Sequence, residues 1–225
     1  MKNYLISIFL LYSITLSSQL MGGFMSPTHT VTDIDGNEYK TVKIGTQIWM
    51  AENLRTATYN DGTSIPNVTD GSTWSGLTSG AWCYYDNNSS YNIPYGKLYN
   101  GYTIDNGKLC PTGWDVPTLN EFDTLYNYLG GGLVAGIKLR NSETVYWVST
   151  NTGTNIVGFN LVGGGRRASN GTFYNFQSNA YLYSSTIDDG ASNWLYYTYT
   201  FNNSDAIYLT TQSKNSGYAI RCIKN

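Results

Sequence analysis

The 225-residue chain is poor in histidine, and this shortage narrows the range of functions. Its one histidine, His29, lies ahead of the region where regular structure is expected, so a Ser/His/Asp or Cys/His catalytic pair inside the folded part is excluded. A zinc site needs several histidines or cysteines, which the folded part does not supply. We therefore expect a protein that is not an enzyme and that uses no cofactor.

Charged residues are also scarce, at 12% of the chain with a formal net charge of −2. Without a basic cluster to follow a phosphate backbone, nucleic acid is not an expected partner. The apolar run Leu5–Leu16 follows Lys2 and is shorter than a membrane span of roughly 20 residues, which is typical of a signal peptide. We expect a signal peptide over residues 1–19, a linker over 20–30, and a secreted or cell-surface protein with no membrane span after cleavage.

Tyrosine is abundant, with 21 residues against 7 Phe and 6 Trp. This aromatic content is sufficient for a core in spite of the low charge. Because tyrosine joins an apolar ring to a polar hydroxyl, it suits half-buried strands and binding surfaces. The composition is even from Val31 onward, so we expect one domain over residues 31–225.

Three cysteines in an exported chain allow one disulfide and one remaining thiol. Cys110 lies just ahead of a predicted helix and Cys222 lies in the predicted last strand, so we expect a bridge between them. Cys83 lies in the aromatic run Ala81–Tyr85 and is expected to be a buried, inert thiol.

The helix signals lie in the first two thirds of the chain. Thr118 and Glu121 form a capping box for a helix that ends at the glycines 130–132, and a second short helix is expected over Leu133–Leu139. The stretch Asp70–Gly80 is predicted to be a loop.

Strand signals dominate the rest and give an α+β fold. Asp35-Gly36 indicates a hairpin turn within Val31–Ile44, which we prefer to the start of a calcium loop. Later strands are predicted over Tyr146–Ser149, Gly158–Leu161, Phe173–Phe176, Ala180–Ser185, Trp194–Phe201, Ala206–Thr211 and Tyr218–Ile223.

Several spaced motifs resemble the Fibrobacter succinogenes major paralogous domain family. They are Gly45–Leu54, Tyr95–Asn100, Leu109–Thr118, Phe159–Gly165, Arg167, Asn170–Phe173, Tyr183–Thr186 and Gly217–Cys222. Two positions depart from the family pattern, since Asp115 stands where histidine is frequent and Tyr183 where tryptophan is frequent.

The resemblance implies a C-type-lectin-like domain with twisted antiparallel sheets, one or two short helices and long loops. It also implies kinship with formylglycine-generating-enzyme-like domains, in exported bacterial surface proteins. Those enzymes use a reactive cysteine pair, whereas Cys110 and Cys222 stand at structural positions. The tryptophans of the shared motifs are expected in the core; they are Trp49, Trp82, Trp114 and Trp147.

Calcium-dependent sugar binding of the C-type-lectin kind lacks its motifs, because neither Glu-Pro-Asn or Gln-Pro-Asp nor Trp-Asn-Asp occurs. Ser192-Asn193-Trp194 has a different order. We interpret Asp188-Asp189-Gly190 as a solvated turn, with calcium held by Asp188, Asp189 and Asn193 as the alternative.

The aromatic strands near the C-terminus are the predicted binding surface, because tyrosine and tryptophan mixed with asparagine and serine resemble an antibody combining site. The candidate ligand-binding residues are Tyr181, Tyr183, Trp194, Tyr196, Asn202, Asn203, Asp205 and Tyr208. Alternation places Tyr196 and Thr198 on the face opposite Leu195, Tyr197 and Tyr199, with part of these rings in the core. For Arg166 and Arg167, which follow three glycines, we prefer a carboxylate partner within the domain to an anion cradle.

The predicted function is recognition of a glycan or a protein ligand on a cell surface, without catalysis. One alternative is a structural component of the cell envelope or matrix that self-assembles through an edge strand. Another follows from the resemblance, since some lectin-fold proteins are diversified by retroelements, and the segment Asn179–Asn215 is rich in Asn, Tyr, Ser and Asp.

Overall fold

The computed structural model describes residues 29–148 and 150–225. The predicted signal peptide and nearly all of the predicted linker lie outside the described residues. Thr30 already begins the first strand, one position ahead of the predicted domain start.

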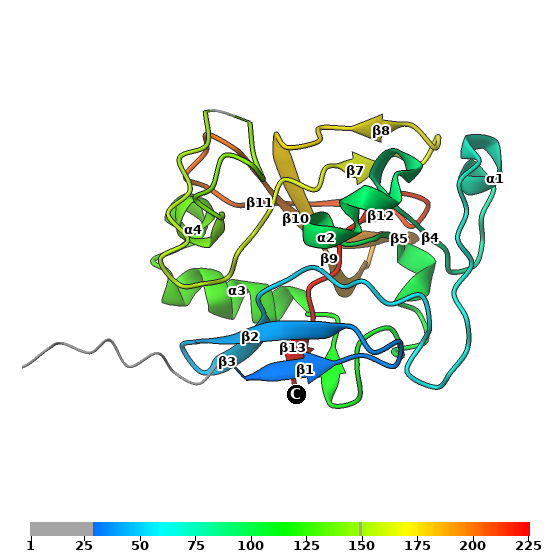
Figure 1. Cartoon of the computed structure of the whole chain (residues 1–225), viewed down its shortest axis with the longest axis horizontal. Coiled ribbons are helices and arrows are strands. Elements are labelled where there is room, and N and C mark those ends of the chain that lie inside the picture. The colour runs from blue at the N-terminus through cyan, green and yellow to red at the C-terminus, as the bar shows by residue number, and fades with distance from the viewer. Residues whose placement is uncertain (1–28, 149) are drawn as a thin grey trace, which may run out of the picture.

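The first sheet joins both ends of the described chain in the order β1-β2-β3-β13-β6 (Figure 1). Its antiparallel strands are β1 (Thr30–Thr32), β2 (Glu38–Ile44), β3 (Gln47–Met50), β13 (Ile223–Lys224) and β6 (Trp114–Asp115). Between β1 and β2, Asp33 Oδ1 accepts hydrogen bonds from the N–H groups of Asp35 and Asn37, and its Oδ2 accepts the Tyr39 hydroxyl at 2.6 Å. These bonds confirm the predicted hairpin turn.

The second sheet has the order β4-β5-β12-β7-β8. Its strands are β4 (Trp82–Cys83), β5 (Leu98–Asn100), β12 (Gly217–Tyr218), β7 (Arg166–Arg167) and β8 (Phe173–Tyr174). The prediction of one last strand over Tyr218–Ile223 is wrong, because the chain crosses here from the second sheet to the first. The whole crossing is buried, so alternation of side chains could not reveal the break.

The disulfide between Cys110 and Cys222 is confirmed, with Cα atoms 6.0 Å apart and a sequence separation of 112. It fastens the segment ahead of β6 to the crossing between the two sheets. Cys83 is a free, buried thiol, and burial raises its pKa to about 12. A thiol with this pKa is almost entirely protonated at neutral pH and is therefore inert.

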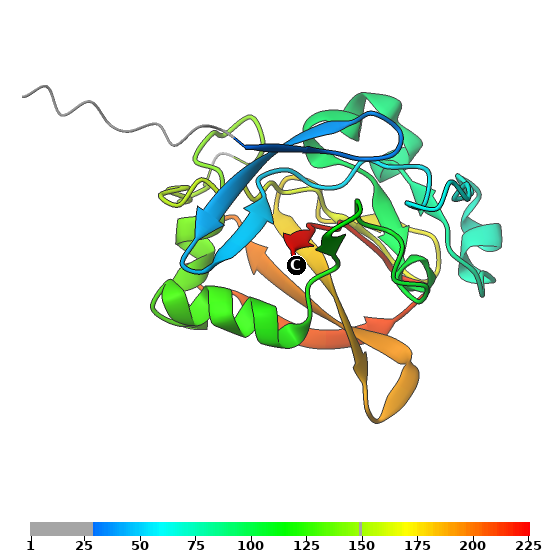
Figure 2. The same cartoon turned by 90° about the horizontal axis from the view of Figure 1, so that it is seen from below.

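The third sheet, β11-β10-β9, contains the longest strands, and its β9–β10 hairpin projects from the body of the molecule (Figure 2). Its strands are β9 (Asn179–Asp188), β10 (Ala191–Phe201) and β11 (Tyr208–Ser213). Helices α3 (Leu119–Tyr128) and α4 (Gly132–Leu139) lie beside one face, where Tyr126 donates its hydroxyl hydrogen to Thr198 Oγ1 at 2.7 Å. The capping box of Thr118 and Glu121 forms as predicted.

The remaining helices are short. They are α1 (Gly71–Ser75), α2 (Asn92–Tyr95) and the 3₁₀ turns η1 (Tyr85–Asn87), η2 (Ser89–Tyr91) and η3 (Gly101–Thr103). The loop predicted over Asp70–Gly80 therefore contains a helix. Asp70 caps it, and the buried Trp74 anchors it by donating its indole N–H to the carbonyl of Asn215 at 2.7 Å.

Two of the predicted strands are not formed in the described chain. Residues 146–147 form a bend after a turn at residues 144–145, and Trp147 turns inward, where its indole N–H donates to the carbonyl of Leu161. Residues 158–161 make only a single bridge, between Leu161 and Arg140. Aromatic and β-branched side chains here fill the core from irregular backbone, which sequence patterns do not separate from strands.

The core confirms the α+β prediction and the role of the motif tryptophans. Trp49, Trp82, Trp114 and Trp147 are all buried. One cluster draws residues from all three sheets, and another joins the first and third sheets to helices α3 and α4. Within the described ranges, none of the helices combines the length and the hydrophobicity that crossing a bilayer requires.

Candidate functional site

Cross-strand pairing divides the side chains of β10 between two faces of the third sheet. Tyr199 pairs with Tyr181 of β9 and with Tyr208 of β11, so these three rings share one face. Thr198 pairs with Leu182 and lies on the other face, against α3. The predicted alternation is thus confirmed for Thr198, but helices cover the face that would otherwise be open.

Two of the predicted ligand-binding residues belong to the core. Tyr181 and Tyr183 are only 6% and 0% exposed. The Tyr183 hydroxyl donates to the carbonyl of Ser216 at 2.8 Å, and the Tyr181 hydroxyl accepts a hydrogen bond from Asn175 Nδ2 at 2.6 Å. Both predictions of surface exposure are corrected, because the second sheet packs against this face and buries its inner rings.

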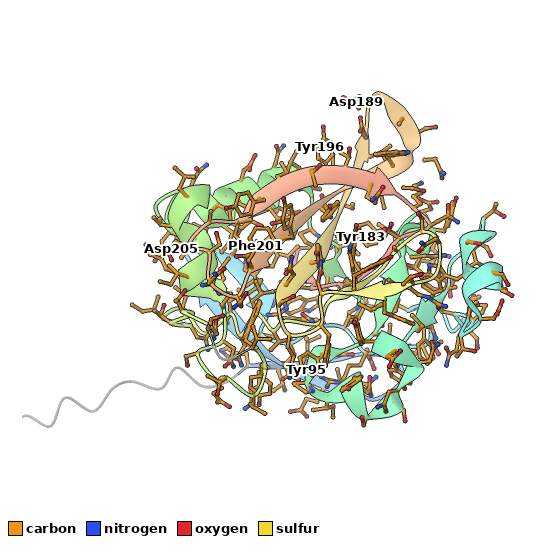
Figure 3. The ribbon with its side chains drawn as sticks, turned by 90° about the horizontal axis from the view of Figure 1, so that it is seen from above. Tyr95, Tyr183, Asp189, Tyr196, Phe201 and Asp205 are labelled. Atoms are coloured by element: carbon orange, nitrogen blue, oxygen red, sulfur yellow. A yellow bond between two sulfur atoms is a disulfide. The ribbon has the colours of Figure 1, made fainter. Side chains whose placement is uncertain are left out.

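The other predicted residues do not form one surface either. Trp194 and Tyr196 share the side of β10 that carries Thr198, whereas Tyr183 of β9 pairs with Tyr197 and lies on the opposite side. Figure 3 labels Tyr196 near the rim of the molecule and Tyr183 nearer its middle. Trp194 is exposed on the projecting hairpin, whereas Tyr196 is half-buried.

The loop between β10 and β11 carries three further candidates beside α4. Asn202 is buried and its amide donates to Thr150 Oγ1, which makes it a structural residue. Asn203 and Asp205 are exposed. Of the eight candidates, Tyr208 alone combines an exposed ring with the face that carries Tyr181.

Three rings of that face, Tyr181, Tyr199 and Tyr208, continue a stack that begins at Tyr218 of β12 in the second sheet, and we call these four rings the tyrosine row. Neighbouring ring centroids are 5.4, 5.8 and 5.2 Å apart, with interplanar angles of 13°, 21° and 27°. The row begins at the fully buried Tyr218 and ends at Tyr208, which is 39% exposed. Each ring of the row is therefore packed against the next, from the core to the surface.

Arg166 of β7 lies beside the tyrosine row. Its guanidinium carbon is 5.6 Å from the ring centroid of Tyr181 and 5.6 Å from that of Tyr174, a ring that is 41% exposed. Arg166 is half-buried, and its Nε has no hydrogen-bond partner among the described residues. Its side chain makes no ion pair with any residue that the structure describes.

Arg167, the next residue, behaves differently. It is buried and donates to the carbonyls of Gly171, Val68 and Thr69. The prediction that one of the two arginines pairs with a carboxylate is wrong, because Arg167 is satisfied by carbonyl groups and Arg166 by none.

A second polar group without a partner lies next to Arg166. The Tyr218 hydroxyl is buried and lies close to the Arg166 guanidinium and the Tyr197 hydroxyl, but it forms no hydrogen bond of good geometry within residues 29–148 and 150–225. Burial raises the pKa of Tyr218, the neighbouring phenol of Tyr197 adds to the shift, and Arg166 opposes it. Tyr218 is therefore a neutral phenol at physiological pH and can donate its proton in a hydrogen bond.

Four residues of this site were not among the predicted binding residues; they are Arg166, Tyr174, Tyr199 and Tyr218. The arginine doublet after three glycines was the one local signal for Arg166. The hydrogen-bond partners of Arg167 distinguish the two arginines, and two of these partners, the carbonyls of Val68 and Thr69, come from a distant segment of the chain. A separate aromatic group near α2, in which Phe176 stacks on Tyr85 at 4.6 Å, also went unpredicted.

Other parts of the surface offer less. Within the described chain, no three Asp, Glu, His or Cys side chains are grouped so that they could hold a metal ion. Asp188 Oδ1 accepts the N–H of Gly190 at 2.9 Å, which confirms the predicted turn at the tip of the hairpin. A hollow of about 690 Å³ on the first sheet is lined in part by Lys40, Val42 and Lys224, and no stacked row of rings lies along it.

The chain matches a known protein family. The model of the Fibrobacter succinogenes major domain matches residues 42–224. The chain belongs to this family. The matched range runs from β2 to β13 and includes Arg166 and the whole tyrosine row, which confirms the family resemblance seen in the sequence. No curated protein and no solved structure matches the chain.

Proposed function

We propose that this Fibrobacter succinogenes major domain is a binding module that recognises a glycan, without catalysing a reaction. The observation that carries the proposal is the tyrosine row, which ends in the exposed Tyr208 and lies beside Arg166 and the exposed Tyr174. Rings held in place by their neighbours lose little side-chain entropy when a ligand binds.

The chemistry of the row suits a sugar. A pyranose ring has an apolar face of C–H groups, which stacks on aromatic rings, and a rim of hydroxyls, which need hydrogen-bond partners. Thr210 and Gln212 of β11 share the face of Tyr208 and supply neutral polar groups. The pairs of each residue with β10 place them on this face, because opposite residues of an antiparallel ladder share a side.

The absence of catalysis and the extracellular location are parts of the same proposal. His29, the one histidine of the chain, lies beside β2 of the first sheet, where its backbone carbonyl accepts the N–H of Thr41. The rings at the surface end of the tyrosine row belong to the third sheet, so this histidine lies beside a different sheet from them. The disulfide favours an oxidising compartment, because such bonds persist outside the cytosol. We also propose a C-type-lectin-like fold, on the strength of the motif order and the late antiparallel sheet.

The test is a glycan panel probed with the domain, residues 29–225, in calcium and then in chelator. We expect binding that survives chelation and falls at least tenfold in Tyr208→Ala and in Tyr174→Ala. Tyr128→Ala is the matched control, because Tyr128 is an exposed tyrosine on α3, and it should bind within twofold of the parent. Wild-type affinity in both site variants would reject the site.

A second candidate function is self-assembly, and it has an observation of its own. The edge strand β11 carries no charged residue, and Leu209 in it is 43% exposed. Natural edge strands usually carry lysine or proline, which discourage pairing with another chain. Sedimentation at increasing concentration would show dimers that Thr211→Lys abolishes, and a monomer at every concentration would exclude this candidate.

A further inference from the structure

We infer that Arg166 is a carboxylate-recognition group and that the preferred ligand of the tyrosine row is an acidic glycan containing a uronic acid. This inference rests on the proposed function and names its ligand class. It comes from the unused hydrogen-bonding capacity of Arg166, from the rings that hold it, and from the phenol next to it.

Arg166 differs from every other arginine of the chain. Each of the others donates at least two hydrogen bonds to carbonyl, amide, hydroxyl or carboxylate oxygens; they are Arg55, Arg140, Arg167 and Arg221. Arg166 forms no such hydrogen bond of good geometry with the described residues: the Tyr218 hydroxyl lies close to its guanidinium, and its Nε is buried without a partner. Since buried donors in folded proteins are nearly always paired, the unused donors mark a place where a ligand supplies the acceptor.

The two rings beside Arg166 explain how its guanidinium is held ready. Tyr174 and Tyr181 lie at equal distances of 5.6 Å from its central carbon. Contact with ring faces fixes a guanidinium by cation–π attraction and leaves its N–H groups free.

The Tyr218 hydroxyl supplies a second donor. It is fully buried and unpartnered in the described part of the chain, and it is close enough to Arg166 for the two to interact electrostatically. A carboxylate has two oxygens that accept hydrogen bonds in one plane, which matches a guanidinium with a phenol beside it.

The charge of the site favours a monoanion. Arg167 is used by backbone carbonyls, so Arg166 contributes one positive charge. Phosphate and sulfate sites commonly gather several cationic or N–H donors. A single arginine next to stacked rings instead fits a sugar ring that carries one carboxylate, with the ring on Tyr174 or Tyr208 and the carboxylate on Arg166.

The experiment measures the affinity of the domain for oligogalacturonate and oligoglucuronate and for their methyl esters, which keep the sugar rings and remove the charge. We expect the acids to bind at least tenfold more tightly than the esters. Arg166→Gln should reduce the affinity for the acids to that for the esters, and Tyr218→Phe should narrow the difference severalfold. Lys43→Gln is the control, because it removes one exposed positive charge from the first sheet and should change neither affinity.

Equal binding of acid and ester by the wild-type domain would overturn the inference, and it would leave the proposed function standing if Tyr208→Ala still abolished binding. Tighter binding of a poly-glutamate peptide than of either oligouronate would also overturn it, because the carboxylate would then belong to a protein. Circular dichroism and the protection of Cys83 from alkylation report whether each variant is folded. A folded wild-type domain that binds none of these compounds also contradicts the inference.

Discussion

The buried phenol of Tyr218 gives a prediction that distinguishes a binding site from a well-packed core. Replacing Tyr218 by phenylalanine removes a hydroxyl that forms no hydrogen bond of good geometry in the described structure and keeps the ring packed between those of Tyr181 and Tyr197. We therefore expect Tyr218→Phe to make the domain more stable, whereas most substitutions of fully buried residues make a protein less stable.

The magnitude follows from the desolvation of the hydroxyl. Burying a polar group without a partner costs about 1 to 3 kcal/mol in proteins. We expect Tyr218→Phe to raise the free energy of unfolding by about 1 kcal/mol, the lower end, because the nearby Arg166 and Tyr197 give the phenol part of its lost solvation. For a domain of this size such a gain raises Tm by roughly 2 to 4 °C.

Tyr183→Phe is the matched control, since the Tyr183 ring packs against that of Tyr218 at 4.7 Å, is equally buried and donates its hydroxyl hydrogen to the carbonyl of Ser216 at 2.8 Å. This substitution should lower the free energy of unfolding by about 1 to 2 kcal/mol because it leaves that carbonyl without a partner. Urea denaturation followed by tryptophan fluorescence measures both values. If Tyr218→Phe destabilised the domain as much as Tyr183→Phe, the Tyr218 hydroxyl would have a structural partner and the reasoning would fail.

Three further predictions concern stability and reactivity. Replacing Cys110 and Cys222 together by alanine should lower the free energy of unfolding by up to about 4 to 5 kcal/mol in the chain-entropy model, because the bridge closes a long loop. Urea denaturation with and without reductant measures this loss, and an unchanged unfolding midpoint would contradict it. Cys83, with its pKa raised to about 12, should resist alkylation at pH 8 in the folded domain and react fully in denaturant, as mass spectrometry would show; rapid labelling of the folded domain would contradict its burial. Asp70 caps α1, and hydrogen bonds from Thr73 and Ser72 lower the pKa of its carboxyl group from 3.8 to about 2. The ionised carboxylate should therefore stabilise α1 fully above pH 4, and this stabilisation should disappear as the pH falls through 2. The fluorescence of Trp74 should follow this loss, and Asp70→Asn, which keeps an oxygen acceptor, should make that region independent of pH; an identical acid transition in both proteins would refute the assignment.

Features set by neighbouring residues were predictable from the sequence. The hairpin at Asp33 and the capping box of Thr118 and Glu121 each depend on side chains within a few positions of the backbone groups that they bind. Helix α4 was also expected, from its apolar pattern and the glycines before it.

Features set by distant segments were not predictable. Helix α1 depends on Trp74, whose indole binds a carbonyl of residue 215, and the sequence around Trp74 reads as a loop. The crossing from β12 to β13 is a buried run that looks like one strand until its partners are known.

The candidate site shows the same limit. Alternation assigned Thr198 and Tyr199 to opposite faces of β10, yet it could not show that helices cover one face and that the second sheet covers the inner part of the other. For that reason Tyr181 was expected at the surface and is buried. Arg166 and Arg167 are indistinguishable by residue type, and only the carbonyl groups brought to Arg167 by Val68 and Thr69 separate their roles.

The most direct test of the central claim is an NMR titration of the domain, labelled with ¹³C in its tyrosine rings, with oligogalacturonate. The account predicts that the ring signals of Tyr174, Tyr199 and Tyr208 shift together along one binding curve while that of Tyr128 on α3 stays fixed. Saturable binding that leaves the signals of Tyr174 and Tyr208 unchanged would place the ligand elsewhere and would contradict the account.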